Sequence, residues 1–198
     1  GCYRRYNCLC YKRMIPFFSF NYQNDLFKEN LNKAFSSVLD SKNYVLGKNV
    51  KDFEKKYSIY NKVKYSIGVS SGLDALIICL KALNVGVNDE VIVASNAYIA
   101  CWLAISNVGA KIIPVEPNEK TFNIDPLKIE KKITKRTKAI MPVHLFGQPC
   151  QMNEIIKIAK KYNLYVIEDN AQAHLAKYNN QYTGTFGHIN ATSFYPTK

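Results

Sequence analysis

Hydrophobic positions along this chain follow two patterns, and the change falls near residue 60. Along residues 25–58 they recur every three to four residues, the spacing of one helical face, with a glycine-containing break at residues 43–50. Beyond residue 60, short apolar runs alternate with amphipathic stretches of helical length. The first pattern predicts a helical N-terminal region, and the second predicts strands that alternate with helices.

The alternating region allows each element to be placed. Strands are expected at residues 65–72, 90–95, 110–116, 138–146, 164–169 and 189–195. Helices are expected at residues 72–83, 99–108, 125–133 and 153–163. Asp125 and Asn153 are the expected N-caps of the last two helices. This alternation is typical of an α/β fold, in which a mostly parallel sheet is covered by helices on both faces and binds ligands beyond its carboxyl edge.

Composition and charge narrow the class of protein. The 198 residues are 47% hydrophobic and 21% charged, and the formal net charge is +12. Nucleic-acid binding would require clustered basic residues with interleaved aromatics, and such a cluster occurs only in residues 1–13. The other lysines are spread along predicted helices and loops, so we expect solvated surfaces and no nucleic-acid partner.

Two segments bear on location and domain organisation. Residues 91–110 carry no charge over a length that could span a membrane, but serines, asparagines and a glycine interrupt them. We therefore expect strand, loop and helix there, and no membrane association. Residues 1–13 are basic and rich in cysteine and lack the apolar core of a signal peptide, so we expect a non-native or disordered extension before a native start at Met14. None of the six cysteines forms a CxxC pair, which fits a reducing cytoplasm.

Several residues that could bind a ligand or take part in a reaction directly follow predicted strands. Gly72, in SSGLDAL, opens a helix whose free backbone N–H groups suit a phosphate, although a simple serine N-cap would have the same sequence. Tyr98 could stack on a flat ring or belong to the core. Asp169 ends a buried apolar strand, where a carboxylate needs a partner such as a cationic ligand atom, Arg or Lys. Gln172, three residues further on, could donate to the same ligand.

The last predicted strand leads to Lys198 through the segment SFYPTK, which also contains Ser193. A lysine held beside a ring cation or in an apolar pocket becomes a nucleophile for carbonyl groups. Pyridoxal 5′-phosphate requires a Schiff-base lysine, an acid that faces the pyridinium nitrogen, a phosphate cradle and a stacking ring. Successive strand ends supply candidates for all four, so their conjunction predicts a pyridoxal phosphate site.

These segments also resemble a known family. SSGLDAL, DEVIVASNAYIACWLAI, GAKIIPVEPNEKTFNIDP, TKAIMPVHLFGQPCQMNEI, YVIEDNAQAH and SFYPTK are similar to segments of the DegT–DnrJ–StrS nucleotide-sugar aminotransferases. The resemblance covers residues 14–198 and implies the large domain of fold-type I pyridoxal phosphate enzymes. It also implies that this domain is incomplete, because family members continue past the lysine and end in a smaller C-terminal domain. ASNAYIACWLAI is most similar to enzymes that aminate 3-keto-6-deoxy sugars attached to dTDP.

The resemblance implies a role for each candidate residue. Lys198 matches the Schiff-base lysine, and Asp169 matches the acid that pairs with the pyridinium nitrogen. Gln172 matches the residue beside the cofactor's 3-hydroxyl, and Tyr98 matches the residue stacked on the ring. The phosphate donors that it implies are Gly72, Leu73 and Ser193.

The implied reaction has two halves that share one cofactor and one base. Glutamate displaces Lys198 from the cofactor, and the freed amine then moves a proton from the alpha carbon of the amino acid to the cofactor. After 2-oxoglutarate leaves, the same steps run backwards on a keto sugar nucleotide. The resemblance thus implies a cytoplasmic aminotransferase, a homodimer when full length, that serves deoxyamino-sugar and surface-polysaccharide biosynthesis.

Other interpretations of the sequence stay open. The truncated chain could be a catalytically inactive remnant of this fold, or it could act only by association with a full-length partner. Related sugar dehydratases keep the fold but carry histidine at the lysine position, so Lys198 argues against that chemistry. His144, His174 and His188 match no common metal-ligand spacing, so we expect no metal site.

Overall fold

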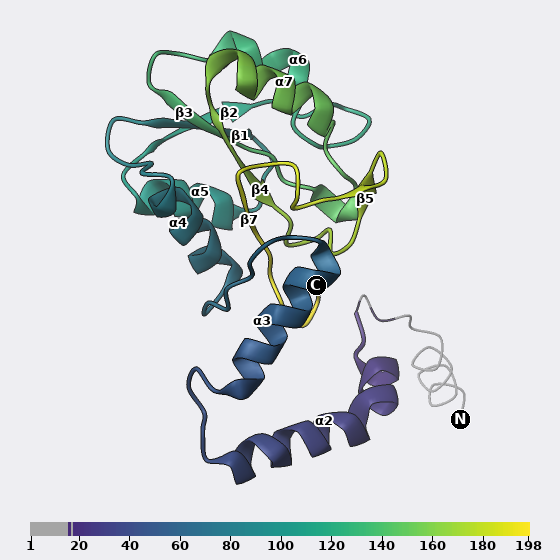
Figure 1. Cartoon of the computed structure of the whole chain (residues 1–198). Coiled ribbons are helices and arrows are strands. Elements are labelled where there is room, and N and C mark those ends of the chain that lie inside the picture. The colour runs from purple at the N-terminus through teal and green to yellow at the C-terminus, as the bar shows by residue number, and fades with distance from the viewer. Residues whose placement is uncertain (1–15, 17) are drawn as a thin grey trace, which may run out of the picture. The chain divides into compact units, whose positions relative to one another are not determined.

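The computed structural model describes residue 16 and residues 18–198 (Figure 1). The expectations for residues 1–13 and for a start at Met14 lie outside the described residues. The chain divides into two compact units, Gly1–Lys51 and Asp52–Lys198. All of the predicted strands and all of the candidate site residues belong to the second unit.

Helices form the N-terminal region, as the spacing of apolar residues predicts. α2 (Asn21–Ser41) is followed by α3 (Lys48–Asn61), and the break between them begins at Lys42, which ends α2 in the left-handed conformation with φ 52°. Within α2 most residues of the predicted apolar face are exposed, and none of the residues of this helix is buried. The spacing of apolar residues in α2 therefore predicts the helix correctly, but these residues do not form a buried core.

The second unit is built on a parallel sheet. Its strands are β1 (Glu90–Ala94), β2 (Lys111–Val115), β3 (Thr137–Met141), β4 (Tyr165–Asp169) and β7 (Ile189–Ala191), in the order β2-β1-β3-β4-β7. Every neighbouring pair in this sheet is parallel. Parallel strands need crossover connections, and those that join β1, β2, β3 and β4 in chain order contain helices, so the predicted α/β class is confirmed.

Helices cover both faces of this sheet (Figure 1). They do so because the strands carry buried apolar side chains on both sides. α4 (Gly72–Ala82) and α5 (Ile99–Asn107) pack in one apolar cluster with Val91 and Val93 of β1. The alternate β1 residues Ile92 and Ala94 belong to the opposite cluster. That cluster is completed by α6 (Pro126–Ile129) and α7 (Met152–Tyr162). The two-residue period of β1 thus divides the core between two layers of helices.

Several predicted element boundaries are wrong. The helix predicted at 125–133 has a single α-helical turn, α6, which continues as a 3₁₀ helix at Glu130–Lys132. Asp125 is its N-cap as expected, and its carboxylate accepts a hydrogen bond of 3.0 Å from the N–H of Leu127. Asn153 is not an N-cap, because α7 already begins at Met152.

Two predicted strands are too long and one does not form. β3 ends at Met141, ahead of a 3₁₀ helix at Leu145–Gly147, and β7 ends at Ala191. Residues 65–72 are not assigned to a strand, although they lead directly into α4 as expected. The sequence interpretation also missed a small hairpin of β5 (Lys177–Tyr178) and β6 (Gln181–Tyr182).

The uncharged stretch at residues 91–110 contains most of β1 and all of α5, as predicted. Among the described residues, no helix has the length and apolar character needed to cross a membrane.

Candidate functional site

Lys198 and Tyr98 lie together beyond the carboxyl edge of the sheet. Tyr98 is the N-cap of α5, just after β1, and its side chain is 63% exposed, so it is not a core residue. Lys198 closes a turn in which its N–H donates to the carbonyl of Tyr195 over 2.8 Å. This turn places Lys198 Nζ 5.8 Å from the ring centroid of Tyr98. A flexible amine and an aromatic face thus share one accessible surface.

Asp169 ends β4 at the same edge of the sheet and is 5% exposed. Its Oδ2 accepts a hydrogen bond of 3.0 Å from Cys101 Sγ, and its Oδ1 accepts one of 3.0 Å from the N–H of Ala171. Burial, and then the negative charge of Asp169, raise the pKa of the Cys101 thiol, so the thiol stays protonated and donates. No cation pairs with Asp169 among the described side chains, which is the environment expected for an acid that receives a cationic ligand atom.

Cys101 was not predicted as part of the site. It follows Tyr98 by three residues, so the N-terminal end of α5, with its N-cap, carries both the aromatic ring and the donor to Asp169. In the sequence, Cys101 stands in an apolar run, and only the spacing from Tyr98 could have indicated that it reaches the site.

Gln172 supports a sharp turn after β3 instead of pointing freely into solvent. Its Oε1 accepts a hydrogen bond of 2.7 Å from the N–H of Phe146. Phe146 and Gly147 both have positive φ, 58° and 81°, so the chain reverses tightly there. Because this bond uses the side-chain oxygen, the Nε2 hydrogens of Gln172 are the donors that remain for a ligand.

The predicted phosphate donors come together at the start of α4. A Cβ placed on Gly72 would lie 3.0 Å from the Cβ of Ser193, so the backbone of Gly72 and the side chain of Ser193 are in contact. Leu73 lies in the first helical turn, where its N–H has no helical partner, and its side chain packs against the core. The first turn of α4, with its free N–H groups, and Ser193 thus lie next to each other at Gly72.

The serine N-cap interpretation of SSGLDAL is confirmed. Ser71 Oγ accepts from the N–H of Asp74 over 3.1 Å. The Asp74 carboxylate accepts hydrogen bonds from the hydroxyls of Ser70 and Ser71, and these bonds lower the pKa of Asp74. An anionic side chain therefore already stabilises this helix N-terminus, beside the contact between Gly72 and Ser193.

The segment that carries Ser193 is fixed by side chains to which the sequence interpretation gave no role in this site. His174 Nε2 donates to the carbonyl of Ser193 over 2.8 Å, and His174 Nδ1 lies 3.3 Å from the hydroxyl of Tyr57 on α3. The ring of Phe194 packs edge-on against those of Tyr57 and Phe53, with centroids 5.2 Å apart in both cases. These contacts hold the chain immediately before the turn to Lys198.

The other two histidines are hydrogen-bonded within the fold. His144 is fully buried, with Nε2 2.9 Å from Glu168 Oε2, while its Nδ1 accepts from the N–H of Cys150. Glu168 also accepts from three backbone N–H groups of the loop at residues 184–187. His188 Nδ1 accepts from the N–H of Val166, at the start of β4. Both rings therefore serve the structure around β4.

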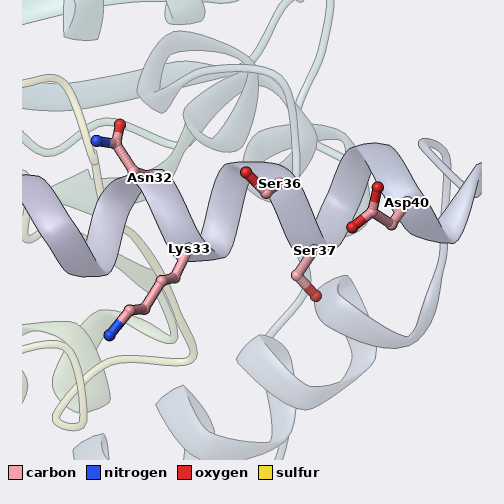
Figure 2. A pocket seen from close by; sticks show the side chains of 5 residues that line it. All are labelled: Asn32, Lys33, Ser36, Ser37 and Asp40. Carbon is pink, nitrogen blue, oxygen red and sulfur yellow. The ribbon is translucent and has the colours of Figure 1, made fainter.

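A hollow along α2 does not form a site of this kind. It is lined by Asn32, Lys33, Ser36, Ser37 and Asp40, and their side chains point to different sides of the helix (Figure 2). Because these polar groups do not converge, the hollow offers no arrangement for catalysis or specific binding.

Comparison with protein families gives an independent result. The sequence profile of the DegT/DnrJ/EryC1/StrS aminotransferase family matches residues 25–198. The dTDP-3-amino-3,6-dideoxy-alpha-D-galactopyranose transaminase of Aneurinibacillus thermoaerophilus is 54% identical over 91% of this chain and 50% of the relative. The dTDP-3-amino-3,4,6-trideoxy-alpha-D-glucose transaminase of Streptomyces venezuelae is 42% identical over 93% of this chain and 48% of the relative.

Solved structures agree with the sequence comparison. S. venezuelae DesV, in complex with a ketimine intermediate, has a TM-score of 0.90 at 42% identity and covers 93% of this chain and 50% of its own. NtdA from Bacillus subtilis with bound cofactor PMP has a TM-score of 0.86 at 38% identity, over 93% of this chain and 42% of its own. The chain spans about half the length of the curated relatives that it matches.

Proposed function

Because the chain belongs to the DegT/DnrJ/EryC1/StrS aminotransferase family, we propose that it is the cofactor-binding half of a pyridoxal phosphate-dependent sugar aminotransferase. The observation that carries the proposal is the buried carboxylate of Asp169, which ends a strand and has no cationic partner among the described residues. The pyridinium nitrogen of pyridoxal phosphate is a cation that fits such an acid. The accessible amine of Lys198 beside the Tyr98 ring supports the same proposal.

Pyridoxal 5′-phosphate, when bound, supplies an electron sink for charge that develops at the alpha carbon of an amino acid. Asp169 would accept a hydrogen bond from the ring nitrogen and hold the proton there, while Cys101 and the N–H of Ala171 fix its carboxylate. Tyr98 would stack on the ring, and Gln172 Nε2 would donate to the 3-oxygen.

Lys198 has two tasks in the proposed mechanism. Its Nζ would hold the cofactor covalently, and the same amine, when free, would act as the base that takes the proton from the substrate's alpha carbon. The backbone of Gly72 and Leu73 and the hydroxyl of Ser193 would hold the phosphate. Through its carbonyl contact with His174, the Ser193 segment sets the path of the chain toward the lysine.

The substrates are proposed from the relatives. We propose glutamate as the amino donor and a dTDP-linked 3-keto-6-deoxy sugar as the acceptor, supported by 54% identity to the Aneurinibacillus transaminase. We further propose that a polypeptide of the relatives' length works as a homodimer in the cytoplasm. The surface-polysaccharide role expected from the sequence rests on the same likeness.

Selective labelling of Lys198 tests the proposal. The protein is incubated with pyridoxal 5′-phosphate and reduced with borohydride, and the modified lysines are mapped by peptide mass spectrometry. We expect the label to concentrate on Lys198, to disappear from that peptide in Lys198→Arg, and to remain in the control Lys128→Arg, which changes a surface lysine beside Asp125. Labelling scattered over many lysines, unchanged by Lys198→Arg, would contradict the proposal and favour a chain that acts by association only.

A further inference from the structure

The segment that carries the proposed cofactor lysine leaves the sheet before it reaches the site. β7 ends at Ala191, whose carbonyl accepts a hydrogen bond of 2.8 Å from the N–H of Asn170. Every residue from Phe194 to Lys198 is exposed. Strand pairing therefore fixes the chain only up to Ala191, and other contacts must determine where the lysine lies.

One hydrogen bond joins residues 193–198 to the rest of the described chain. It runs from His174 Nε2 to the carbonyl of Ser193 over 2.8 Å. The other hydrogen bonds of these residues lie within the segment, from the N–H of Tyr195 to Ser193 Oγ over 3.3 Å and from the N–H of Lys198 to the Tyr195 carbonyl over 2.8 Å. These bonds form a continuous series from the imidazole to the lysine, so a movement of Ser193 would also move Lys198.

The side chain of Ser193 depends on the same bond. Its Oγ accepts from the N–H of Tyr195, so its hydroxyl hydrogen remains available to a ligand. This hydroxyl lies next to Gly72, where the phosphate is proposed to bind. The orientation of the Ser193 backbone therefore affects both the phosphate donor and the lysine.

Tyr57 determines which nitrogen of His174 carries the hydrogen. A carbonyl oxygen can only accept, so the hydrogen shared with Ser193 must lie on Nε2. In the neutral ring Nδ1 is then an acceptor, and the hydroxyl of Tyr57 lies 3.3 Å from it and can donate. Because a hydrogen on Nδ1 alone would leave no donor for Ser193, the Tyr57 hydroxyl favours the tautomer that holds the segment.

Aromatic rings add packing at the same point. The ring of Phe194 lies edge-on to that of His174, with centroids 5.1 Å apart, and contacts the rings of Tyr57 and Phe53. Phe194 is nevertheless 59% exposed, so its packing removes only part of its surface from water. We therefore expect the hydrogen bond from His174 to contribute much of the attachment.

We propose that His174 is a positioning residue for Lys198. With its tautomer set by Tyr57, the imidazole holds the Ser193 carbonyl and thereby fixes the turn that follows. That turn brings the lysine amine 5.8 Å from the ring centroid of Tyr98. His174 takes part in no chemical step, because it acts on the reacting amine only through the backbone.

His174 also connects the two sides of the proposed cofactor site. It lies on the same short segment as Asp169, the proposed partner of the ring nitrogen, and bonds to the segment that leads to Lys198. A single side chain thus sets the position of the lysine relative to the acid. The inference rests on the proposed function, since the position of Lys198 matters to the reaction only if this lysine holds the cofactor.

Backbone mobility measured without cofactor tests the attachment. ¹⁵N relaxation gives order parameters for the amides of Phe194 and Tyr195 in the unchanged protein and in variants. We expect about 0.85 in the unchanged protein and below about 0.6 in His174→Leu, which fills the space but lacks the donor. We expect His174→Gln to restore the higher value, because its side-chain N–H group can replace Nε2 as the donor.

Labelling with pyridoxal phosphate and borohydride measures the consequence for Lys198. We expect the share of label on Lys198 to fall about ten-fold in His174→Leu and about three-fold in Tyr57→Phe, and to recover in His174→Gln. Tyr57→Phe keeps the aromatic ring and removes only the hydroxyl, so it tests the same attachment should His174→Leu fail to fold. Circular dichroism verifies the fold of each variant.

His188→Leu is the matched control. His188 also bonds to the backbone, through Nδ1 to the N–H of Val166, but this bond lies at the start of β4 and away from residues 193–198. We expect this variant to change neither the order parameters of residues 194 and 195 nor the share of label on Lys198.

Three results would overturn the inference. The first is an unchanged order parameter and an unchanged share of label in His174→Leu. The second is an equal loss in His188→Leu, because general loosening of the fold would then explain the effect. The third is a loss that His174→Gln does not restore, which would assign the effect to packing. Scattered labelling of the unchanged protein would contradict the proposed function alone, because the order parameters are measured without cofactor.

Discussion

Cys101 joins the helix that carries Tyr98 to the acid at the end of β4. Its thiol donates to Asp169 Oδ2 over 3.0 Å, and both residues are buried. A carboxylate in this setting depends on every donor it has, because removal of one partner from a buried charged group is more costly than the bond itself is worth. Removal of the Cys101 thiol, although it is small and uncharged, is therefore expected to lower the stability of the fold measurably.

We predict that Cys101→Ala lowers the free energy of unfolding by about 1–3 kcal/mol at neutral pH, and that Cys101→Ser recovers much of this because its hydroxyl can donate to Asp169. Urea denaturation measures both. Cys79→Ala and Cys79→Ser form the control pair, because Cys79 is also buried but its thiol faces only the carbonyl of Asn190, at 3.6 Å. Equal losses in Cys101→Ala and Cys101→Ser would show that packing alone matters there.

The residues of the candidate site differ in how far sequence could predict them. Tyr98 and Asp169 follow buried strands directly, so the rule that ligands bind beyond strand ends selects them, and the structure brings Tyr98 to Lys198. Cys101 and His174 could not be assigned this way. Their significance depends on hydrogen bonds to Asp169 and to the Ser193 carbonyl, which are 68 and 19 residues away along the chain.

At the scale of elements, the periodicity of the sequence predicted whether a segment is a helix or a strand better than it predicted where the element begins and ends. The alternation at residues 65–69 is that of a strand, yet no strand forms, because pairing needs a neighbour and the described residues supply none. The run at 138–146 continues apolar past Met141, but β3 ends there and the chain turns through the 3₁₀ helix at Leu145–Gly147. The β5–β6 hairpin turns through Asn179 and Asn180, both with positive φ, which is a signal that the sequence does contain.

The start of β1 is tied to the connection before β3 through one buried acid. Glu90 is 1% exposed, and its oxygens accept bonds from the Thr134 hydroxyl, at 2.6 Å, and the Arg136 guanidinium, at 2.9 Å. The Thr134 bond is the main reason that the pKa of Glu90 lies below its usual value of 4.5; burial opposes this and Arg136 adds to it. A lowered pKa in the folded state means that the charged form stabilises the fold above pH 4.5 and that this contribution is lost as the pH falls below that value.

We therefore predict that Glu90→Gln lowers the free energy of unfolding by about 1–3 kcal/mol at pH 7. The difference from the unchanged protein should shrink as the pH falls below 4.5, because Glu90 itself then becomes neutral. Urea denaturation across this pH range measures both effects. Glu119→Gln, at an exposed position, is the control and should change neither value. A difference that stays constant with pH would mean that the shape of the side chain matters and its charge does not.

At the scale of the whole second unit, three thiols are buried on the two faces of one sheet. Cys79 and Cys101 belong to the cluster with α4 and α5, and Cys150 belongs to the opposite cluster. Burial raises the pKa of all three above the usual 9.0, to about 12 for Cys79. The acids at the end of β4 add to this, Asp169 for the first two thiols and Glu168 for Cys150. The two carboxylates at the end of β4 thus affect the ionisation of thiols in both helix layers.

These thiols should make the fold sensitive to alkali. A pKa raised in the folded state gives stability that is complete below pH 9.0 and is lost as the pH rises toward the folded value, because the unfolded chain then releases protons that the folded chain retains. We expect each thiol to cost up to about 1.4 kcal/mol per pH unit above pH 9.0. Cys79→Ala, Cys101→Ser and Cys150→Ser, each measured by urea denaturation under reducing conditions at neutral pH and above pH 9, should lose stability less steeply than the unchanged protein. The unchanged protein and the three variants share the same lysines and tyrosines, so the contributions of those side chains cancel when the pH curves are compared. Parallel pH curves would show that the thiols ionise as readily in the folded chain as in the unfolded one.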